Sequence, residues 1–570
     1  MKNVYLVSAM ITLFLTACGS YNDKTSQEPS IRGAIVDNTS WYLDQSSVVR
    51  DITVTFTTPN SSLCAPYTNP SAALRPCTLD DVNHDTNPYD TYKPALSVAY
   101  TTTTFPLVNE TTNALLLQKG KSTRSANQKS YKVNLNSKTN LYEGQRKLQY
   151  NKQFFDMTRI RNKLSFDLMQ SIPNIPSLKT EFVRMTLNGI DLGLFTKVES
   201  YDKEYLLHRG WNKDDNLYKA QNFTFYLKPE LALNSKGKAS NLAAFSTIIE
   251  PQRGKYQSKL IEMLEAVNKN DVNIDAVVAK YFNRENYLTW LAINILMGNV
   301  DTITQNFFLL NPLNSDTFYF LPWDYDDGWG WYMQHGENPN YYSRWEKSIA
   351  RWWDSPLHSK FLSIKKNRDA LDLKIQELRT NYLSDAKIQA KVDSYKGVVA
   401  PYILTSPDLD NLVYADTNST ITKRDWEAEC DILKTRLQDN LDEYESQKGS
   451  PMPFWLIVEY TANKLTIKWD KAVDFENDEI VYDVLVSNSP DFNTTERNET
   501  ALPTDNIALS LSSFGEVTYS TTISLASGKH YVKIKAREKN NAAHFRYGFD
   551  SYYDSTIKKI YHGVFEFVVN

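Results

Sequence analysis

The sequence predicts an α+β chain that ends in an all-β sandwich. β-rich segments come first, and helical patterns dominate from about residue 256 to residue 447. Beyond Gly449 the predicted segments alternate apolar and polar residues with a period of two, as strands do. The chain has 570 residues, and about 150 residues are expected per domain, so several packed domains should be present.

The first residues carry an export signal. Lys2 is followed by the apolar stretch Val4 to Leu15, which is too short to span a bilayer permanently, and Leu15-Thr16-Ala17-Cys18 matches a bacterial lipobox. The resemblance to lipoprotein signal peptides implies that residues 1–18 are the signal with its lipobox. It also implies cleavage before Cys18, lipidation of the Cys18 thiol and a tether over residues 19–45. An ordinary signal peptide that happens to end in Cys is the alternative. We therefore expect an exported chain that is lipid-anchored to the bacterial envelope, at the outer membrane or the cell surface.

The composition bears on the class of partner. The formal net charge is −4, from 63 basic and 67 acidic side chains, so the chain offers no excess of positive charge to a nucleic acid backbone and no nucleic-acid partner is expected. Hydrophobic residues make up 41% and aromatic residues 13%, which is enough for folded cores. Beyond the signal, no stretch reaches the roughly 18 uninterrupted apolar residues of a membrane helix.

Residues 46–114 form a β-rich region in which strands such as Ile52 to Phe56 alternate with irregular loops. The pattern leaves open whether this region is part of the domain that follows. Export permits a disulfide between Cys64 and Cys77 without requiring one. Cys430 lies in a charged helical pattern, where we expect a structural thiol and not a nucleophile.

The segment after residue 114 predicts strands around one helix. A strand near Leu115 to Leu117 and a strand from Lys129 to Leu135 flank a loop, and a helix follows over about 156–170. Two further strands, Phe182 to Leu187 and Leu192 to Val198, flank Asn188-Gly189, the dipeptide that a tight hairpin turn prefers.

Further along the chain, the helix Tyr287 to Met297 is apolar nearly all round, which indicates burial on every side. Two short strands, Phe307 to Leu310 and Phe318 to Leu321, follow it. Helical patterns then continue to Gln447. Residues 452–570 read as β-strands, with Trp469 on an early strand and Tyr531 on a late one. That order resembles a fibronectin type III sandwich. We expect it to serve as a spacer or docking module, including contact with a surface polymer.

The loop after the buried helix carries the chemistry. Asp301 precedes Asn306 by five residues, the spacing between the catalytic Asp and the metal-binding Asn of protein kinases, and the acidic loop with Asp324 and Asp326 follows the second short strand. Asp301 would accept the proton of the acceptor hydroxyl. Asn306 and Asp324 would hold Mg²⁺ with hard oxygen ligands, and Asp326 would assist. The sequence therefore predicts phosphoryl transfer.

These residues, in this order, resemble the CotH kinase family of atypical protein kinases. The other pieces of the resemblance are Gly120 to Arg124, Lys129 to Lys132, Arg161-Asn162, Asn188-Gly189 to Gly193, Glu199, Asn216 to Lys219, Asn299 to Asn306 and Pro322 to Asp326. The resemblance covers 115–448. It implies a divergent, two-lobed kinase-like fold that uses ATP and Mg²⁺ to phosphorylate hydroxyls of an exported protein.

The resemblance also implies a set of ATP-binding residues. Lys129 or Lys132 takes the place of the strand lysine that grips the phosphates, and Lys129 is preferred because it shares a strand face with Tyr131. Lys219 is a second candidate, and Glu199 falls where the linker between lobes should lie. The loop Ser125 to Gln128 lacks the Pro and the second basic residue that the family pattern contains, which predicts weaker nucleotide binding.

Several alternatives remain open. A surface-anchored binding or structural protein with the same fold and no catalysis fits the scarcity of ATP outside the cytoplasm. A glycosidase that pairs Asp301 with Asp324 would not need Asn306. The tryptophans after the acidic loop either pack that segment or form an aromatic wall for a substrate. They are Trp323, Trp329, Trp331, Trp345, Trp352 and Trp353.

Overall fold

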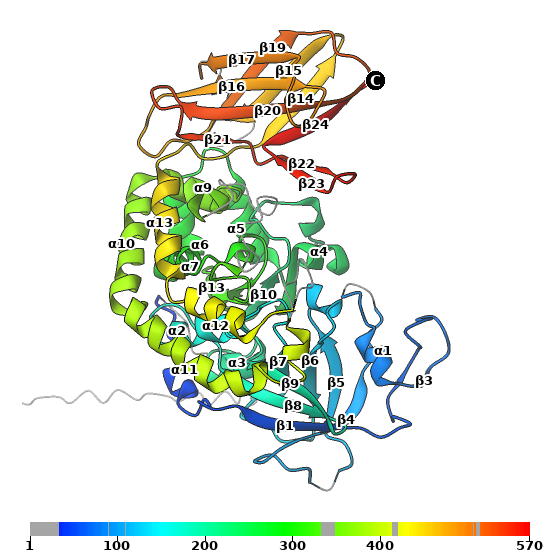
Figure 1. The fold of residues 1–570 in the computed structure, drawn as a ribbon. Helices are drawn as coiled ribbons and strands as arrows, with labels where there is room; N and C mark the ends of the chain where they lie inside the picture. The colour runs from blue at the N-terminus through cyan, green and yellow to red at the C-terminus, as the bar shows by residue number, and fades with distance from the viewer. Residues whose placement is uncertain are drawn as a thin grey trace, which may run out of the picture.

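A computed structural model of the chain describes residues 33–88, 91–108, 110–331, 348–412, 420–504, 507–508 and 514–570. The lipobox with Cys18, most of the expected tether and Trp345 lie outside the described residues. Figure 1 shows a β-barrel at one end of the molecule, a helical region in the middle and a C-terminal β region at the other end. The fold is therefore α+β, as the sequence predicts.

The barrel is closed and antiparallel except at one seam. Its strands follow the order β1-β4-β5-β6-β7-β9-β8, and β1 and β8 close it in parallel. The barrel core contains inward side chains such as Val54, Leu116 and Val133. Since β1 and β4 belong to this barrel, the β-rich N-terminal region is continuous with the strands that follow it. The strand bounds are β1 (Arg50–Thr55), β4 (Leu96–Thr102), β5 (Ala114–Lys119), β6 (Ser130–Leu135), β7 (Lys147–Asn151), β8 (Thr180–Leu187) and β9 (Ile190–Val198).

A small irregular unit lies between β1 and β4. It contains β2 (Leu63–Cys64), β3 (Arg75–Pro76) and α1 (Leu79–Asn83). Cys64 and Cys77 form a disulfide here, with their Cα atoms 5.2 Å apart. Cys430 is a buried thiol whose pKa is raised by burial, which favours the structural role expected from the sequence.

The predicted hairpin and helix are both present. Asn188 (φ 47°) and Gly189 (φ 81°) form the turn between β8 and β9, and both take the positive φ values that a type I′ turn requires. The helix α2 spans Arg161–Met169 and begins five residues later than predicted. Asp156 does not start it. Its carboxylate instead accepts hydrogen bonds from the backbone N–H groups of Thr158 and Arg161.

A second sheet and a buried helix form the centre of the molecule. The sheet has the order β11-β10-β12-β13, and α7 (Arg284–Met297) packs on β13. The strands are β10 (Asn216–Ala220), β11 (Ile249–Arg253), β12 (Phe307–Asn311) and β13 (Tyr319–Pro322). The predicted burial of α7 is confirmed, because its residues from Asn286 onward are all buried. The helix ends at Gly298, whose φ of 58° lies in the left-handed region that favours glycine.

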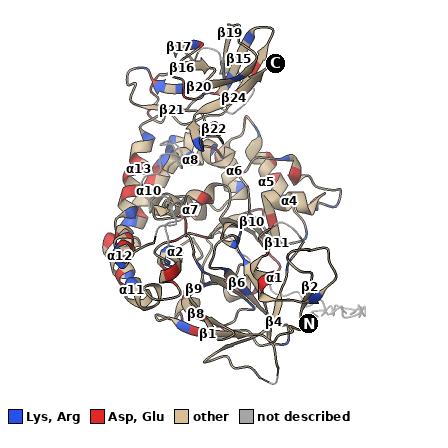
Figure 2. Cartoon of the chain, turned by 45° about the vertical axis from the view of Figure 1, so that its right-hand side comes forward, with Lys and Arg blue, Asp and Glu red and all other residues tan. Residues whose placement is uncertain are grey.

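Further helices surround this centre. They are α3 (Lys203–His208), α4 (Leu242–Ile248), α5 (Ser258–Asn268), α6 (Ile274–Tyr281), α8 (Ser348–Trp352), α9 (Pro356–Ser363), α10 (Lys365–Asn381), α11 (Asp385–Ile403), α12 (Lys423–Ile432) and α13 (Arg436–Lys448). Basic and acidic side chains are interspersed over α10 to α13, as on a solvated surface (Figure 2). Among the helices that the structure describes, none has the length and apolar character that a membrane crossing requires.

The C-terminal β region contains two antiparallel sheets that share one core. The sheets are β14-β15-β19-β18 and β17-β16-β20-β21, with β24 paired to β20 and a separate hairpin of β22 and β23. Trp469 and Tyr482 from opposite sheets meet in the core with ring centroids 5.1 Å apart. The strands are β14 (Leu456–Thr461), β15 (Lys464–Asp470), β16 (Ile480–Ser487), β17 (Arg497–Leu502), β18 (Ile507–Ala508), β19 (Glu516–Thr522), β20 (Gly528–Glu538), β21 (Phe545–Tyr547), β22 (Ser551–Asp554), β23 (Lys559–His562) and β24 (Val564–Val569). The fibronectin type III resemblance itself stays a prediction.

The described tryptophans after the acidic loop mostly pack the interior. Trp329 is fully buried, and its Nε1 donates to Ser165 Oγ of α2 at 2.8 Å. The Trp353 ring contacts Phe475 and Phe514 of the C-terminal β region, with centroids 5.6 and 5.4 Å apart. Of the two interpretations of this cluster, packing is the one that the structure favours for these side chains.

Candidate active site

The site begins with two strands that bring distant loops together. β12 and β13 pair antiparallel, and the backbone N–H of Trp323 donates to the Asn306 carbonyl at 3.2 Å. Asn306 (φ 58°) and Asp324 (φ 54°) both take the left-handed conformation that Asn and Asp tolerate best among residues with a Cβ. The acidic loop therefore starts directly beside the loop that carries Asn306.

Asp301 lies in the short 3₁₀ helix Val300–Ile303 and faces this junction. Its Oδ2 accepts hydrogen bonds from Gln305 Nε2 at 3.0 Å and from Asn306 Nδ2 at 3.4 Å. Two amides thus orient one oxygen of the Asp301 carboxylate. The structure brings Asp301 and Asn306 into contact, as their spacing predicts.

The acidic loop concentrates negative charge against Asp301. Burial, followed by the charge of Asp324, raises the pKa of Asp326 well above its usual range. Burial, followed by the charge of Asp326, does the same to the pKa of Asp327, to which Asp301 also contributes. Asp301, Asp324, Asp326 and Asp327 therefore form one half-buried carboxylate cluster. The kinase-like spacing in the sequence predicts no role for Asp327, although it directly follows Asp326 in the chain.

Neighbouring helices hold the acidic loop in place. The backbone N–H of Tyr325 donates to Asn162 Oδ1 of α2 at 3.0 Å, and its hydroxyl donates to Asn294 Oδ1 of α7 at 2.8 Å. Gly328 packs so tightly that a Cβ would lie 3.1 Å from the Met297 carbonyl oxygen. The carboxylates are thus mounted on buried elements, which restricts their movement.

A lysine that the sequence analysis missed lies beside this cluster. Lys119 ends β5, and its Nζ donates to Asn151 Oδ1 at 2.5 Å and lies 5.5 Å from the centre of the Trp323 ring. Burial lowers the pKa of Lys119 to about 8, although the charges of Asp324 and Asp326 act in the opposite direction. The alternation of β5 was the available signal, because it places Lys119 on the face opposite the core residue Leu116.

Two of the predicted lysines share this neighbourhood. Lys219 lies on β10, where burial lowers its pKa while the charge of Asp324 raises it. Lys132 is half-buried on the outer face of β6, and its charge lowers the pKa of Lys119. Lys119 and Lys219 thus lie next to the carboxylate cluster, and Lys132 lies close to Lys119. We call them the lysine group.

The structure corrects the preference for Lys129. Lys129 precedes β6, and its Nζ donates to the Arg124 carbonyl oxygen of its own loop at 2.7 Å. The face that it was expected to share, with Tyr131 and Val133, points into the barrel core. Lys132 lies on the opposite face of β6 and close to Lys119, which favours it over Lys129.

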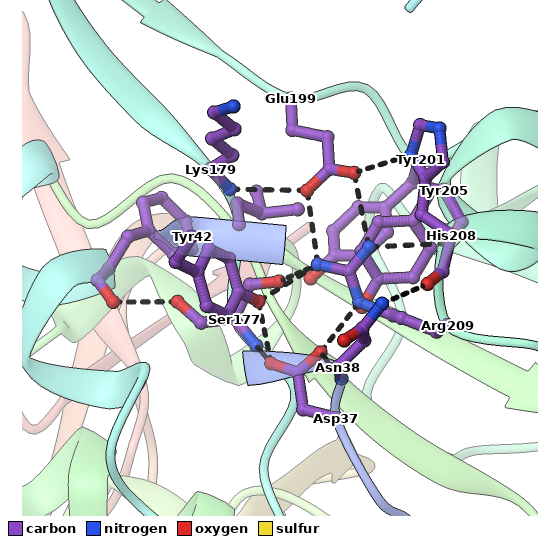
Figure 3. Close-up of polar contacts among 12 residues, drawn as sticks. Asp37, Asn38, Tyr42, Ser177, Lys179, Glu199, Tyr201, Tyr205, His208 and Arg209 are labelled. Carbon is purple, nitrogen blue, oxygen red and sulfur yellow. Dashed lines mark hydrogen bonds and ion pairs between the residues drawn. The ribbon is translucent and has the colours of Figure 1, made fainter. Parts of the chain in front are cut away.

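Glu199 also differs from its expected role in nucleotide binding. Its side chain is buried, and its two carboxylate oxygens accept hydrogen bonds from the Arg209 guanidinium at 3.1 and 3.0 Å (Figure 3). One of them also accepts from the Lys179 backbone N–H at 3.1 Å. Arg209 in turn binds Asp37, which joins the N-terminal segment to this network. The Glu199 carboxylate is thus already fully bonded within the protein.

Comparison with known proteins identifies relatives of the central region. The model of the family described as CotH kinase protein matches residues 116–444. The inner spore coat protein H of Bacillus subtilis (strain 168) is 26% identical over 325 residues, which covers 56% of this chain and 84% of that protein.

Two solved structures were also found at low similarity. The Helicobacter pylori proinflammatory kinase CtkA is 12% identical, covering 57% of this chain and 92% of that one, with a TM-score of 0.26. The HipA, HipB and operator DNA complex of the Shewanella oneidensis MR-1 toxin–antitoxin system is 11% identical, covering 53% and 58%, with a TM-score of 0.22. The family model itself spans more than half of the chain, and the protein therefore belongs to the CotH kinase protein family.

Proposed function

We propose that this protein is an ATP- and Mg²⁺-dependent phosphotransferase that acts on hydroxyl groups of an exported protein. The observation that carries this proposal is the convergence of the carboxylate cluster with Asn306 and the lysine group, from segments far apart in the chain. Phosphoryl transfer depends mainly on neutralising charge and aligning the reactants, and this arrangement supplies groups of both signs for that task.

The donor set fits a hard divalent cation. Carboxylate and amide oxygens are the ligands that Mg²⁺ takes in proteins. The crowded carboxylates repel one another, as their raised pKa values reflect, and a divalent cation between them would relieve this repulsion. Asn306, Asp324 and Asp326 would hold the metal. When bound, Mg²⁺ supplies charge neutralisation for the β- and γ-phosphates.

The side chains then have distinct tasks. The acceptor oxygen forms a bond to the γ-phosphorus, the bond from that phosphorus to the β,γ-bridging oxygen breaks, and ADP leaves. Asp301 accepts the hydroxyl proton, oriented by the amides of Gln305 and Asn306. Lys119 and Lys219 would contact phosphate oxygens, for which ammonium groups are suitable donors.

The proposal is tested with the purified chain, labelled ATP and Mg²⁺, by comparing the wild type with Asp301→Ala and Asp324→Ala. Transfer that requires Mg²⁺ and falls in both variants would support it. Equal transfer by all three proteins would overturn it.

The lysine assignment has its own test. Lys119→Met is expected to weaken ATP binding by about tenfold or more, because a charge-assisted hydrogen bond contributes roughly 1.5–3 kcal/mol. Lys129→Met is the matched control. It removes the same charge about ten residues further along the chain, where the ammonium donates to the carbonyl of Arg124 in its own loop, and should leave ATP affinity unchanged. Calorimetric titration of both variants decides between them, and a larger loss in Lys129→Met would restore the original preference.

We also infer an envelope location from the lipobox. The wild-type chain should incorporate labelled fatty acid and sediment with membranes when it is produced in a bacterial host. Cys18→Ser removes the thiol that would be acylated, so this variant should lose the label and leave the membrane fraction. If Cys18→Ser still sediments with membranes, the anchor assignment is wrong.

A further inference from the structure

A separate pocket lies between the end of α13 and the C-terminal β region. Its volume is about 510 Å³, within the range of roughly 300–1,000 Å³ that is typical of small-molecule sites. The walls come from Ser446 to Ser450, the loop at Asp491, strands β20 and β21, and the hairpin strand β23. None of the residues of the carboxylate cluster or the lysine group lines it.

Lys533 projects into this pocket from β20. It alternates with the core residues Val532 and Ile534, so it lies on the outer face of its sheet, where its Nζ sits 4.2 Å from the centre of the Tyr547 ring. Among the described residues, no carboxylate lies within ion-pair distance of this ammonium. Burial lowers its pKa. Lys533 is thus a half-buried cation beside a cavity, with no counterion in the part of the chain that the structure describes.

The other side chains around the pocket give it a positive character. Lys559 and Arg546 line it and are positively charged, and Asp491 is the carboxylate that the lining contains. His544 and His562 add ring nitrogens to the lining, and His544 pairs with Glu538 at 2.8 Å. The charge of Lys533 contributes to a lowered pKa of His562, after burial, so these two nitrogen-bearing groups lie near each other.

Asp491 forms no ion pair with Lys533. Its carboxylate accepts hydrogen bonds from the backbone N–H of Asn493 at 3.0 Å and from the Asn493 side-chain amide at 2.5 Å. Both of its oxygens therefore accept hydrogen bonds within the turn that contains Asp491. An anionic group in the pocket would find the Lys533 ammonium, which has no ion-pair partner among the described residues.

The pocket also presents ring faces and hydroxyl groups. Phe545, Tyr547 and Tyr561 contribute aromatic surface, and Ser446 and Ser450 contribute hydroxyls from the end of α13 and the residues after it. Such a combination suits a ligand with a compact ring body, polar substituents and one charged group. An inorganic anion alone would leave most of the volume unfilled.

We propose that this pocket binds a small acidic sugar, with the carboxylate or phosphate of the sugar against Lys533 and its ring against Tyr547 and Tyr561. This site is independent of the proposed phosphotransfer. It gives the C-terminal β region a ligand-binding role of its own.

The experiment is calorimetric titration of the full-length chain with glucuronic acid, glucose 6-phosphate, glucose and inorganic phosphate. The expected result is that one or both acidic sugars bind at least about tenfold more tightly than glucose and than phosphate, since a charge-assisted bond and ring contact are both required. Whichever of the two acidic sugars binds more tightly shows whether the pocket prefers a carboxylate or a phosphate. Absence of binding by both acids, or equal binding of glucose, would overturn the proposal. Equal binding of inorganic phosphate would overturn it as well.

Two variants localise the site. Lys533→Gln is expected to lose at least about tenfold in affinity for the acidic sugar, because the charged partner is gone. Its thermal midpoint should not fall, since the lost ammonium has no described counterion. Lys529→Gln is the matched control. It removes the same charge from the same strand and the same face, but Lys529 pairs with Glu566 at 2.9 Å and does not line the pocket. Equal affinities of the two variants would show that the pocket is not the binding site.

Discussion

Replacing Asp301 with alanine is expected to slow phosphoryl transfer by roughly 10²–10⁴-fold, the usual contribution of a positioned general base. ATP affinity should persist in this variant, because the proposed metal and phosphate contacts come from other side chains. Asp324→Ala should behave differently, losing both transfer and Mg²⁺-dependent ATP binding, since it removes a proposed metal ligand. Single-turnover rates and binding titrations on the same preparations separate the two effects.

Asp316→Ala provides a matched control for these substitutions. Asp316 lies in the turn between β12 and β13, and its side chain is 51% exposed and 3.8 Å from Lys259. It shares the local hairpin with Asn306 but contributes no charge to the carboxylate cluster. Its activity should equal that of the wild type. If Asp301→Ala keeps full activity while Asp324→Ala does not, Asp301 is not the base.

A wild-type chain that binds ATP and Mg²⁺ but transfers no phosphoryl group would favour the non-catalytic alternative. In that case the pocket at Lys533 becomes the more informative site, because sugar binding there does not depend on transfer. The two activities are thus separable by experiment.

Local patterns in the sequence were sufficient to predict several elements of the kinase-like region. Asn188-Gly189 specifies its turn through positive φ values, and α7 is apolar on every face, so both follow from short stretches of chain. Asp301 and Asn306 are five residues apart in the sequence and are also in contact in the structure, because the 3₁₀ helix and the start of β12 hold them together.

Long-range pairing explains what the sequence could not show. The side chains of Lys119, Lys129 and Lys132 are oriented by which face of β5 and β6 turns into the barrel. That orientation depends on closure of the barrel, in which β1 pairs with β8 from a distant part of the chain. The Glu199 carboxylate pairs with Arg209, which follows it by ten residues and also binds Asp37. A family pattern places such a residue along the chain without revealing its partners.

Arg209→Ala is expected to destabilise the protein by about 3–5 kcal/mol, because it leaves a buried carboxylate without its charged partner. The Arg209 side chain is 0% exposed and bonds to Glu199 and to Asp37 Oδ1. Its Nη2 also donates to the Ser177 carbonyl at 2.7 Å. The urea midpoint of the transition that reports on this region should therefore fall clearly.

The control for Arg209 is an exposed pair of the same chemistry. Arg184 and Asp191 lie 2.6 Å apart on the β8–β9 hairpin, with side chains 45% and 31% exposed. Arg184→Ala should cost at most about 1 kcal/mol, since solvent screens such pairs. A fall as large as that of Arg209→Ala would mean that burial does not set the difference.

The double variant Arg209→Ala with Glu199→Gln tests the cause of this instability. If a stranded carboxylate is responsible, removing its charge should recover part of the lost stability, so the two changes will not add. Glu199→Gln alone also bears on the nucleotide site. The network in Figure 3 commits its carboxylate to Arg209, so ATP affinity should be unchanged in this variant. A loss of ATP affinity with an unchanged urea midpoint would instead return Glu199 to the nucleotide-binding role that its position in the chain suggested.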